Sequence, residues 1–293
     1  QAEPVDKAMK FASGRILVKS KPGLDEPKFL TILSKHGGKS DRKIGRTGVH
    51  IVKVPPGLEK KIVEELNAES SVEFAEVDGL VEPSLIPNDP IFGSQWHHNK
   101  IGTPTAWDGA SAAGLTIAIL DTGVEATHPD LAAVLVPGWN TVSQNTDTSP
   151  VNSHGTLVST TAAAIFNNGV GGAGVARDAK IMPLRITNDS AGWAYWSDIA
   201  NGVTWATDHG AKVVSNSFAS YQGSTVIAAS DVLRSKGGLM IASGGNDSAA
   251  LTYADNSIIV AGATDSADNK ASWSNTGPFV DVAAPGLNVY TTG

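Results

Sequence analysis

The chain has 293 residues, of which 41% are hydrophobic and 17% charged, and its formal net charge is −7. This length and composition predict a globular protein of about two domains with a sizeable core. The sequence contains no cysteine, which excludes disulfides, thiolate zinc sites and a cysteine nucleophile. No stretch approaches the roughly 18 apolar residues of a membrane-spanning helix, so we expect no membrane partner.

The charge is distributed unevenly along the chain. Residues 1–84 carry 14 Lys and Arg against 13 Asp and Glu, whereas residues 85–293 carry 8 against 16. This change in composition predicts a domain boundary near residue 84. The second part offers no basic patch, so we expect no nucleic-acid partner. The chain begins at Gln1 without an apolar signal region, which fits either a removed signal peptide or a start within a longer gene product.

Residues 13–84 show strand and helix patterns in the order βαββαβ. Strands are expected at Arg15–Lys19, Lys43-Ile44, Val49–Val54 and Val72–Val77, and helices at Glu26–His36 and Leu58–Asn67. This order predicts a ferredoxin-like α+β domain. The pattern by itself favours a small independent module. The alternative is a domain whose tail enters a neighbouring cleft, because an extended, proline-rich segment follows it.

Residues 85–293 alternate between strands and helices, which predicts an α/β doubly wound parallel sheet. The first strand, Leu115–Leu120, is a continuous apolar run typical of a strand that is buried on both faces. Further strands are expected at Lys180–Ile186, Lys212–Ser217, Leu239–Ser243, Ser257–Ala263 and Phe279–Ala283, and helices at His154–Phe166, Ser197–Asp208 and Thr225–Ser235.

Two residues in this pattern suggest chemistry. Asp121 follows the first strand, where the reactive groups of such sheets gather, although Asp121-Thr122-Gly123 also fits a solvated tight turn. His154 opens an Ala-rich helix and precedes Gly155, which permits a close approach. A strand-end Asp and a helix-start His are able to form the orienting pair of a nucleophilic triad. A purely structural histidine is the simpler alternative.

Taken together, the motifs resemble those of the subtilisin-like serine proteases (peptidase family S8), and of their thermitase-like branch. The matching segments are Asp121–Val124, His128–Leu131, His154–Thr156, Gly171–Ala176, Gly245-Asn246 and Ala284–Gly286. The resemblance covers residues 86 to 293 in the family's order. It implies a subtilisin-like peptidase domain at 85–293, and it implies that residues 13–84 are a propeptide that acts as an intramolecular inhibitor.

The resemblance also implies roles for individual residues. Asp121 would orient the general base His154, and Asn246 would donate a hydrogen bond to the oxyanion, although a turn residue is the alternative for Asn246. Seven residues would bind substrate. Ser217, Phe218 and Ala219 would form a strand that pairs with the substrate backbone. Ser243, Gly244 and Gly245 would form a wall of the specificity pocket, and Trp196 would lie near an outer apolar subsite.

The nucleophilic serine of the family lies in a Gly-Thr-Ser motif, which does not occur in this chain. The resemblance places it beyond Gly293, so the chain is expected to be C-terminally incomplete and inactive alone. The complete protein is expected to be a secreted, monomeric serine endopeptidase precursor that acts on proteins and peptides. The alternatives are a non-catalytic peptide-binding protein of this fold and an aspartic protease, which would need a second catalytic carboxylate.

The family resemblance further implies a structural calcium ion. The matching ligand positions are the side chains of Asp89, Asp130 and Asn168 and the backbone carbonyls of Ile165, Val170 and Gly172. A set of oxygen ligands suits a hard cation such as Ca²⁺. An Asn-Gly turn with two ordinary surface acids is the alternative.

Overall fold

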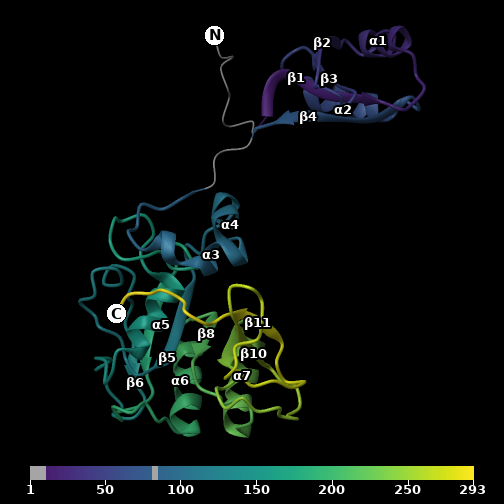
Figure 1. Ribbon diagram of the computed structural model, residues 1–293. Helices are drawn as coiled ribbons and strands as arrows, with labels where there is room; N and C mark the ends of the chain where they lie inside the picture. The colour runs from purple at the N-terminus through teal and green to yellow at the C-terminus, as the bar shows by residue number, and fades with distance from the viewer. Residues whose placement is uncertain (1–10, 81–84) are drawn as a thin grey trace. The chain divides into compact units, whose positions relative to one another are not determined.

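The chain folds as two compact units, Gln1–Pro83 and Ser84–Gly293, in a computed structural model that describes residues 11–80 and 85–293 (Figure 1). The predicted boundary near residue 84 lies outside the described residues.

The first unit has the predicted βαββαβ order. Its elements are β1 (Phe11–Ser20), α1 (Glu26–Lys35), β2 (Lys39–Lys43), β3 (Val49–Lys53), α2 (Glu59–Asn67) and β4 (Val72–Gly79). The sheet is antiparallel with the order β2-β3-β1-β4. Ile16 and Val18 of β1 pack against Phe29 and Leu33 of α1 and Leu66 of α2 in one core. The ferredoxin-like arrangement is therefore confirmed.

The second unit is built on a seven-stranded sheet. Its elements are η1 (Phe92–Ser94), α3 (Trp96–Ile101), α4 (Thr103–Gly109), β5 (Thr116–Asp121), β6 (Trp139–Asn140), α5 (His154–Ala163), β7 (Lys180–Arg185), α6 (Trp196–Asp208), β8 (Val213–Asn216), α7 (Ser224–Ser235), β9 (Leu239–Ser243), β10 (Ile258–Thr264) and β11 (Val282–Pro285). The order is β11-β10-β9-β8-β5-β7-β6, and every pairing between these strands is parallel.

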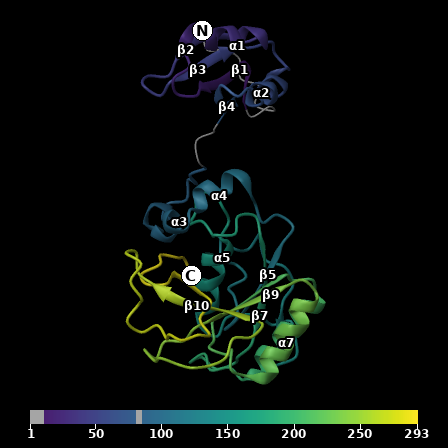
Figure 2. The same ribbon diagram turned by 90° about the vertical axis from the view of Figure 1, so that its right-hand side faces the viewer.

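Helices cover the two faces of this sheet, which confirms the doubly wound α/β fold (Figure 2). Alternate residues of β5 point to opposite faces. Leu120 belongs to the core formed with α6 and α7, whereas Ile119 packs in a second core with Ala163 of α5. The continuous apolar run of β5 follows from burial on both faces. Within residues 11–80 and 85–293, no helix combines the length and apolarity needed to cross a bilayer.

The parallel strands bring several loop-bearing ends to one edge of the sheet. Asp121 ends β5, Asn216 ends β8 and Ser243 ends β9. In the sheet, β7 and β6 lie on one side of β5, and β8, β9, β10 and β11 lie on its other side. Such a switch point opens a crevice at the carboxyl ends of the strands, and this edge therefore carries the candidate site.

The predicted helix end at Phe166 is wrong, because α5 stops at Ala163. Ala164 adopts a ψ of 147°, and the N–H of Ile165 donates to the carbonyl of Asp130 at 3.0 Å instead of continuing the helix. Phe166 instead packs edge-on against Trp107, with ring centroids 5.0 Å apart. The apolar spacing in the sequence continues beyond Ala163, but the bond from Ile165 to Asp130 ends the helix. Spacing alone therefore could not predict the helix end.

The last strand also begins later than predicted, at Val282 instead of Phe279. The Phe279 side chain is buried in the main core, and the carboxylate of Asp281 accepts the backbone N–H of Val260 at 2.7 Å. The backbone N–H of Asp281 also donates to the carbonyl of Val260 at 3.0 Å, so the two segments meet one residue before β11 begins. The short elements β6, α3 and α4 were not predicted.

A buried histidine in α3 makes the free energy of unfolding depend on pH. The His97 side chain is buried, and neither ring nitrogen has a hydrogen-bond partner among the described residues. Burial lowers the pKa of His97 to about 4, and the adjacent His98, with ring centroids 4.2 Å apart, also lowers it. The native state thus resists protonation that the unfolded chain accepts below about pH 6.5.

We predict that His97→Phe weakens the loss of stability on acidification. In the parent, the free energy of unfolding should fall by up to about 3 kcal/mol as the pH drops from 6.5 to 4, because only the unfolded state gains a proton there. Urea unfolding of both proteins at several pH values measures this slope. The same replacement at exposed His209 serves as the control, and equal pH slopes for the parent and His97→Phe would contradict the prediction.

Candidate active site

The centre of the candidate site is a hydrogen bond between Asp121 and His154. The Nδ1 of His154 lies 2.8 Å from Oδ1 of Asp121. The Asp121 side chain is 1% exposed and the His154 side chain 54% exposed, so the imidazole links a buried carboxylate to solvent. The hydrogen bond to Asp121 raises the pKa of His154, and burial opposes this rise. The arrangement suits a general base whose ring is oriented by an acid.

The close approach of α5 to the end of β5 depends on glycine. A Cβ atom at Gly155 would lie 2.2 Å from the carbonyl oxygen of Gly123 and 3.1 Å from Cβ of Asp121. Gly123 itself has a φ of 96°, in the left-handed region that favours glycine. The prediction that Gly155 permits a close approach agrees with this geometry.

Sequence reasoning missed two residues that position this pair. Thr122 donates its backbone N–H to Oδ1 of Asp121 at 2.7 Å, and its hydroxyl accepts the N–H of Gly155 at 3.0 Å. The side-chain carbonyl of Asn152 accepts the N–H of His154 at 2.9 Å. An Asn two residues before a helix start is a recognisable signal for such a bond, and this signal was available in the sequence.

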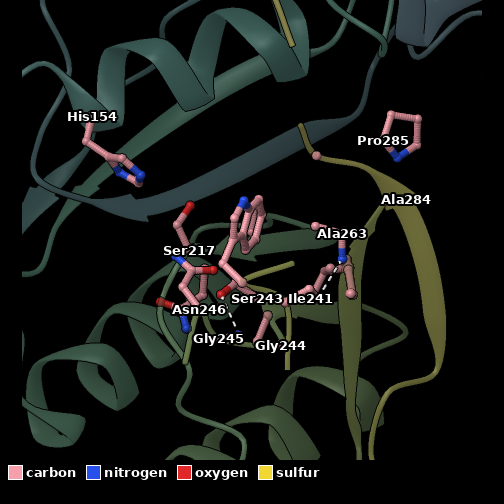
Figure 3. A pocket seen from close by; sticks show the side chains of 18 residues that line it. His154, Ser217, Ile241, Ser243, Gly244, Gly245, Asn246, Ala263, Ala284 and Pro285 are labelled. Carbon is pink, nitrogen blue, oxygen red and sulfur yellow. Dashed lines mark hydrogen bonds between the residues drawn. The ribbon is translucent and has the colours of Figure 1, made fainter. Parts of the chain in front are cut away.

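A cavity of about 330 Å³ opens beside His154 at the carboxyl ends of the strands. Figure 3 shows the imidazole reaching from α5 towards the side of the cavity that holds Ser217 and Asn246. Five predicted residues line it together with His154: Ser217, Ser243, Gly244, Gly245 and Asn246. The structure adds lining residues to which the sequence assigned no role: Ser215, Asn216, Ile241, Ala242, Ala261, Gly262, Ala263, Trp273, Ser274, Ala284, Pro285 and Gly286.

The wall formed by Gly244 and Gly245 is held by its neighbours. The N–H of Gly244 donates to the carbonyl of Ala261 at 2.9 Å, and the hydroxyl of Tyr221 donates to the carbonyl of Gly244 at 3.1 Å. Gly245 has a φ of 90°, and a Cβ there would lie 2.5 Å from the amide nitrogen of Asn275. A side chain at Gly245 would therefore displace Asn275, and glycine at this position allows the wall to pack closely against it.

The remaining predicted substrate-binding residues lie around a second cavity. Trp196, Phe218 and Ala219 line a space of about 400 Å³, together with Trp193 and Ile199. Its lining is largely apolar and aromatic. Ser217 and Phe218 are consecutive residues that line the first and the second cavity, respectively, so the segment that follows β8 connects the two.

The predicted calcium ligands converge only in part. Asp89 and Asp130 are both buried. Asp89 accepts the backbone N–H groups of residues 167, 168 and 169 at 2.8 to 3.1 Å. Asp130 accepts the side-chain amide of Asn168 at 2.9 Å and the N–H of Gly172 at 3.2 Å. The loop after α5 thus wraps around two carboxylates, while a ligand role for the carbonyls of Ile165, Val170 and Gly172 stays a prediction.

The two carboxylates of this loop accept bonds from N–H groups, and the side-chain oxygen of Asn168 accepts the N–H of Val170. Burial raises the pKa of Asp130, the bonds from Asn168 and Gly172 lower it, and the charge of Asp89 raises it further. Neither carboxylate forms an ion pair within residues 11–80 and 85–293. No group of three His, Cys, Asp or Glu side chains gathers as a metal site in that part of the chain. A cation here would therefore rely on amide and carbonyl oxygens as well.

Comparison with known proteins adds the family relationship. Residues 112–293 match the model of the subtilase family, Peptidase_S8, and residues 1–78 match the fervidolysin N-terminal prodomain. The chain is 43% identical over 212 residues to thermitase from Thermoactinomyces vulgaris, covering 70% of this chain and 75% of thermitase. It is 33% identical over 290 residues to a thermophilic serine proteinase from Bacillus sp. strain AK1, covering 96% and 72%.

A solved structure shares the fold. A protease from Pseudoalteromonas arctica PAMC 21717 superposes with a TM-score of 0.59 at 30% sequence identity, covering 68% of this chain and 72% of that one. The parallel sheet, the prodomain match and the Asp-His pair agree with these relationships. The chain therefore belongs to the subtilase family of serine proteases and carries a fervidolysin-type N-terminal prodomain.

Proposed function

We propose that this protein is a serine endopeptidase precursor that hydrolyses peptide bonds in proteins through an Asp-His-Ser triad, with Asp121 and His154 as the acid and the base. The observation that carries the proposal is the 2.8 Å hydrogen bond between buried Asp121 and His154, whose imidazole lines an open cavity. The family's Gly-Thr-Ser motif does not occur among these 293 residues, so the proposal assigns no residue of this chain as the nucleophile. A non-catalytic binding protein would have no use for this oriented pair.

The residues then have the following roles. Asp121 accepts the Nδ1–H of His154 and stabilises the imidazolium, which leaves Nε2 to take the proton of the attacking hydroxyl and return it to the leaving amine. The side chain of Asn246, which is exposed at the cavity, donates to the oxyanion that forms on the scissile carbonyl. Buried Asp121 keeps the base in one tautomer.

The two cavities support a binding role for the seven predicted substrate-binding residues. We assign the cavity walled by Ser243, Gly244 and Gly245 to the side chain just before the scissile bond. The backbone of Ser217, Phe218 and Ala219 pairs with the substrate as an added strand. Trp196 then contributes to a subsite further from the scissile bond, where the apolar lining favours a bulky apolar side chain.

The domain organisation follows from the same proposal. Residues 13–84 act as a propeptide that inhibits the peptidase domain, residues 85–293, and the match of residues 1–78 to a prodomain family supports this division. Cleavage between the two units releases the active enzyme. We also propose that the mature enzyme is monomeric and acts outside the cell, as the family relationship suggests.

A structural calcium ion completes the proposal. Asp89, Asp130 and Asn168 would hold it, with carbonyl oxygens of Ile165, Val170 and Gly172. The ion would neutralise two buried carboxylates that lie close together and would hold the loop that follows α5. It takes no part in the chemical step.

The first test replaces Asp121 by Asn in the complete gene product. We predict that kcat falls by about 10⁴-fold, as expected when the orienting acid of such a triad is lost. The acid limb of the pH profile of kcat/KM should also move to lower pH, because the bond to Asp121 raises the pKa of His154. Peptide hydrolysis followed from pH 5 to 9 measures both effects, and Asp231→Asn on the exposed face of α7 is the control.

The second test concerns Asn246. We predict that Asn246→Ala lowers kcat by about 10² to 10³-fold and leaves KM nearly unchanged, because an oxyanion donor acts in the transition state. Steady-state kinetics on one peptide substrate measure the two constants. A rise in KM with unchanged kcat would show that Asn246 is a turn residue or a ground-state contact instead.

The third test is calcium removal. We predict that Ca²⁺ at 100 times its dissociation constant stabilises the parent protein by about 2.7 kcal/mol relative to a chelator. Asp130→Ala should abolish the calcium dependence of thermal unfolding. Asp265→Ala, which removes a half-buried loop carboxylate that accepts the N–H groups of Ala267 and Asn269, should retain it. Identical melting of the parent protein in calcium and in chelator would refute the site.

A further inference from the structure

Asn152 connects His154 to a loop that carries exposed aromatic side chains. The segment of residues 187–196, which ends at the first residue of α6, is called the aromatic loop here, since it bears Trp193, Tyr195 and Trp196. Trp193 is 80% exposed and Trp196 is 47% exposed, and both line the second cavity. Tyr195 is 79% exposed.

Three polar groups of Asn152 bind three different segments. Its side-chain oxygen accepts the N–H of His154 at 2.9 Å, and its side-chain amide donates to the carbonyl of Ser190 in the aromatic loop at 3.0 Å. Its backbone carbonyl accepts the hydroxyl of Thr122 at 3.2 Å. Thr122 also binds Asp121 and Gly155. Asn152 is thus the link between the Asp-His pair and the aromatic loop.

The geometry of the loop makes this link specific. The loop turns at Gly192, whose φ is 85°, and a Cβ there would lie 3.5 Å from the Asn152 side-chain nitrogen. The N–H of Gly192 donates to the carbonyl of Asp189, and the hydroxyl of Thr187 donates to the carbonyl of Trp193. These bonds hold Ser190 and Trp193 within one compact turn, so a displacement at Trp193 is carried to Ser190.

The start of α5 has little other support. The N-cap residue Ser153 makes no side-chain capping bond, although the first N–H groups of a helix need external acceptors. The N–H of His154 finds its acceptor in Asn152, and that of Gly155 finds it in Thr122. The backbone from which the imidazole projects is therefore held by the residue that also binds the aromatic loop.

We propose that Asn152 is a positioning residue, which sets the orientation of His154 against Asp121 according to the position of the aromatic loop. This inference rests on the proposed function for its catalytic consequence. Binding of an apolar substrate side chain against Trp193 holds the loop, the Ser190 carbonyl holds the Asn152 amide, and the imidazole is kept in line with Asp121. Long substrates therefore gain in kcat as well as in binding.

The chain offers a matched control for Asn152. Asn256 makes the same pair of bonds elsewhere, since its side-chain oxygen accepts the N–H of Ile258 at 2.9 Å and its amide donates to the carbonyl of Tyr221 at 3.0 Å. Both residues are half-buried. Asn152→Ala and Asn256→Ala remove the same chemical groups, but only the first removes a contact to His154.

The first measurement is the pKa of the His154 imidazole, followed by NMR in the complete gene product. Asn152→Ala should lower this pKa towards the ordinary histidine value, because a loosened ring bonds less well to Asp121, and Asn256→Ala should leave it unchanged. Gly192→Ala, which strains the loop, should shift the pKa in the parent protein but not in the Asn152→Ala background. An unchanged pKa in Asn152→Ala overturns the proposal.

The second measurement compares a single-residue ester with a peptide that has a bulky apolar residue several positions before the scissile bond. Asn152→Ala should lower kcat for the peptide by about 10-fold, within the roughly 10²-fold cost of a 1 Å misplacement. It should lower kcat for the ester by a smaller factor, because the ester does not contact the aromatic loop, and it should leave KM nearly unchanged. If kcat falls by the same factor for both substrates, Asn152 acts only as a helix cap, and the proposed link between the aromatic loop and His154 is overturned.

The two measurements separate the inference from the proposed function. If the complete gene product hydrolyses no peptide but Asn152→Ala still shifts the His154 pKa, the positioning role stands and the protease assignment fails. If the peptide is hydrolysed and the pKa does not change, the protease assignment stands and the positioning role fails.

Discussion

The site depends on one hydrogen bond, between Asp121 at the end of β5 and His154 at the start of α5. A buried carboxylate is costly unless it is paired and hydrogen-bonded, and the sheet leaves Asp121 only 1% exposed. His154 supplies the partner while more than half of its own side chain stays accessible. The same bond thus satisfies a buried charge and presents an oriented imidazole to the cavity.

This bond is possible because two backbone segments approach more closely than side chains allow. Gly123 and Gly155 meet where a Cβ atom would clash with a carbonyl oxygen. The first amides of α5 then bind Asn152 and Thr122 in place of the N-cap side chain. The turn after β5 and the start of α5 are therefore held together by the same hydrogen bonds that position Asp121 and His154. The aromatic loop is connected to them through Asn152.

Much of this was predictable from local sequence. Period-2 and helical apolar patterns identified the main strands and helices, because burial on one or both faces imposes those periods. The pair Asp121 and His154 could be singled out because each stands at an element end, where parallel strands present reactive groups. Prediction failed at the C-terminus of α5 and at the start of β11, because bonds to Asp130 and Val260 determined those limits.

By itself, the sequence determined the two-part organisation, the α/β class, the candidate acid and base, and the glycines beside them, because these are written in composition, periodicity and neighbouring residues. The tertiary structure alone decided which residues that are distant in the sequence line the same cavity or contact each other. It divided the predicted substrate-binding residues between two cavities and joined Ser190 to His154 through Asn152. The physical reason is that these contacts link separate strands and loops, whose distances no local pattern specifies.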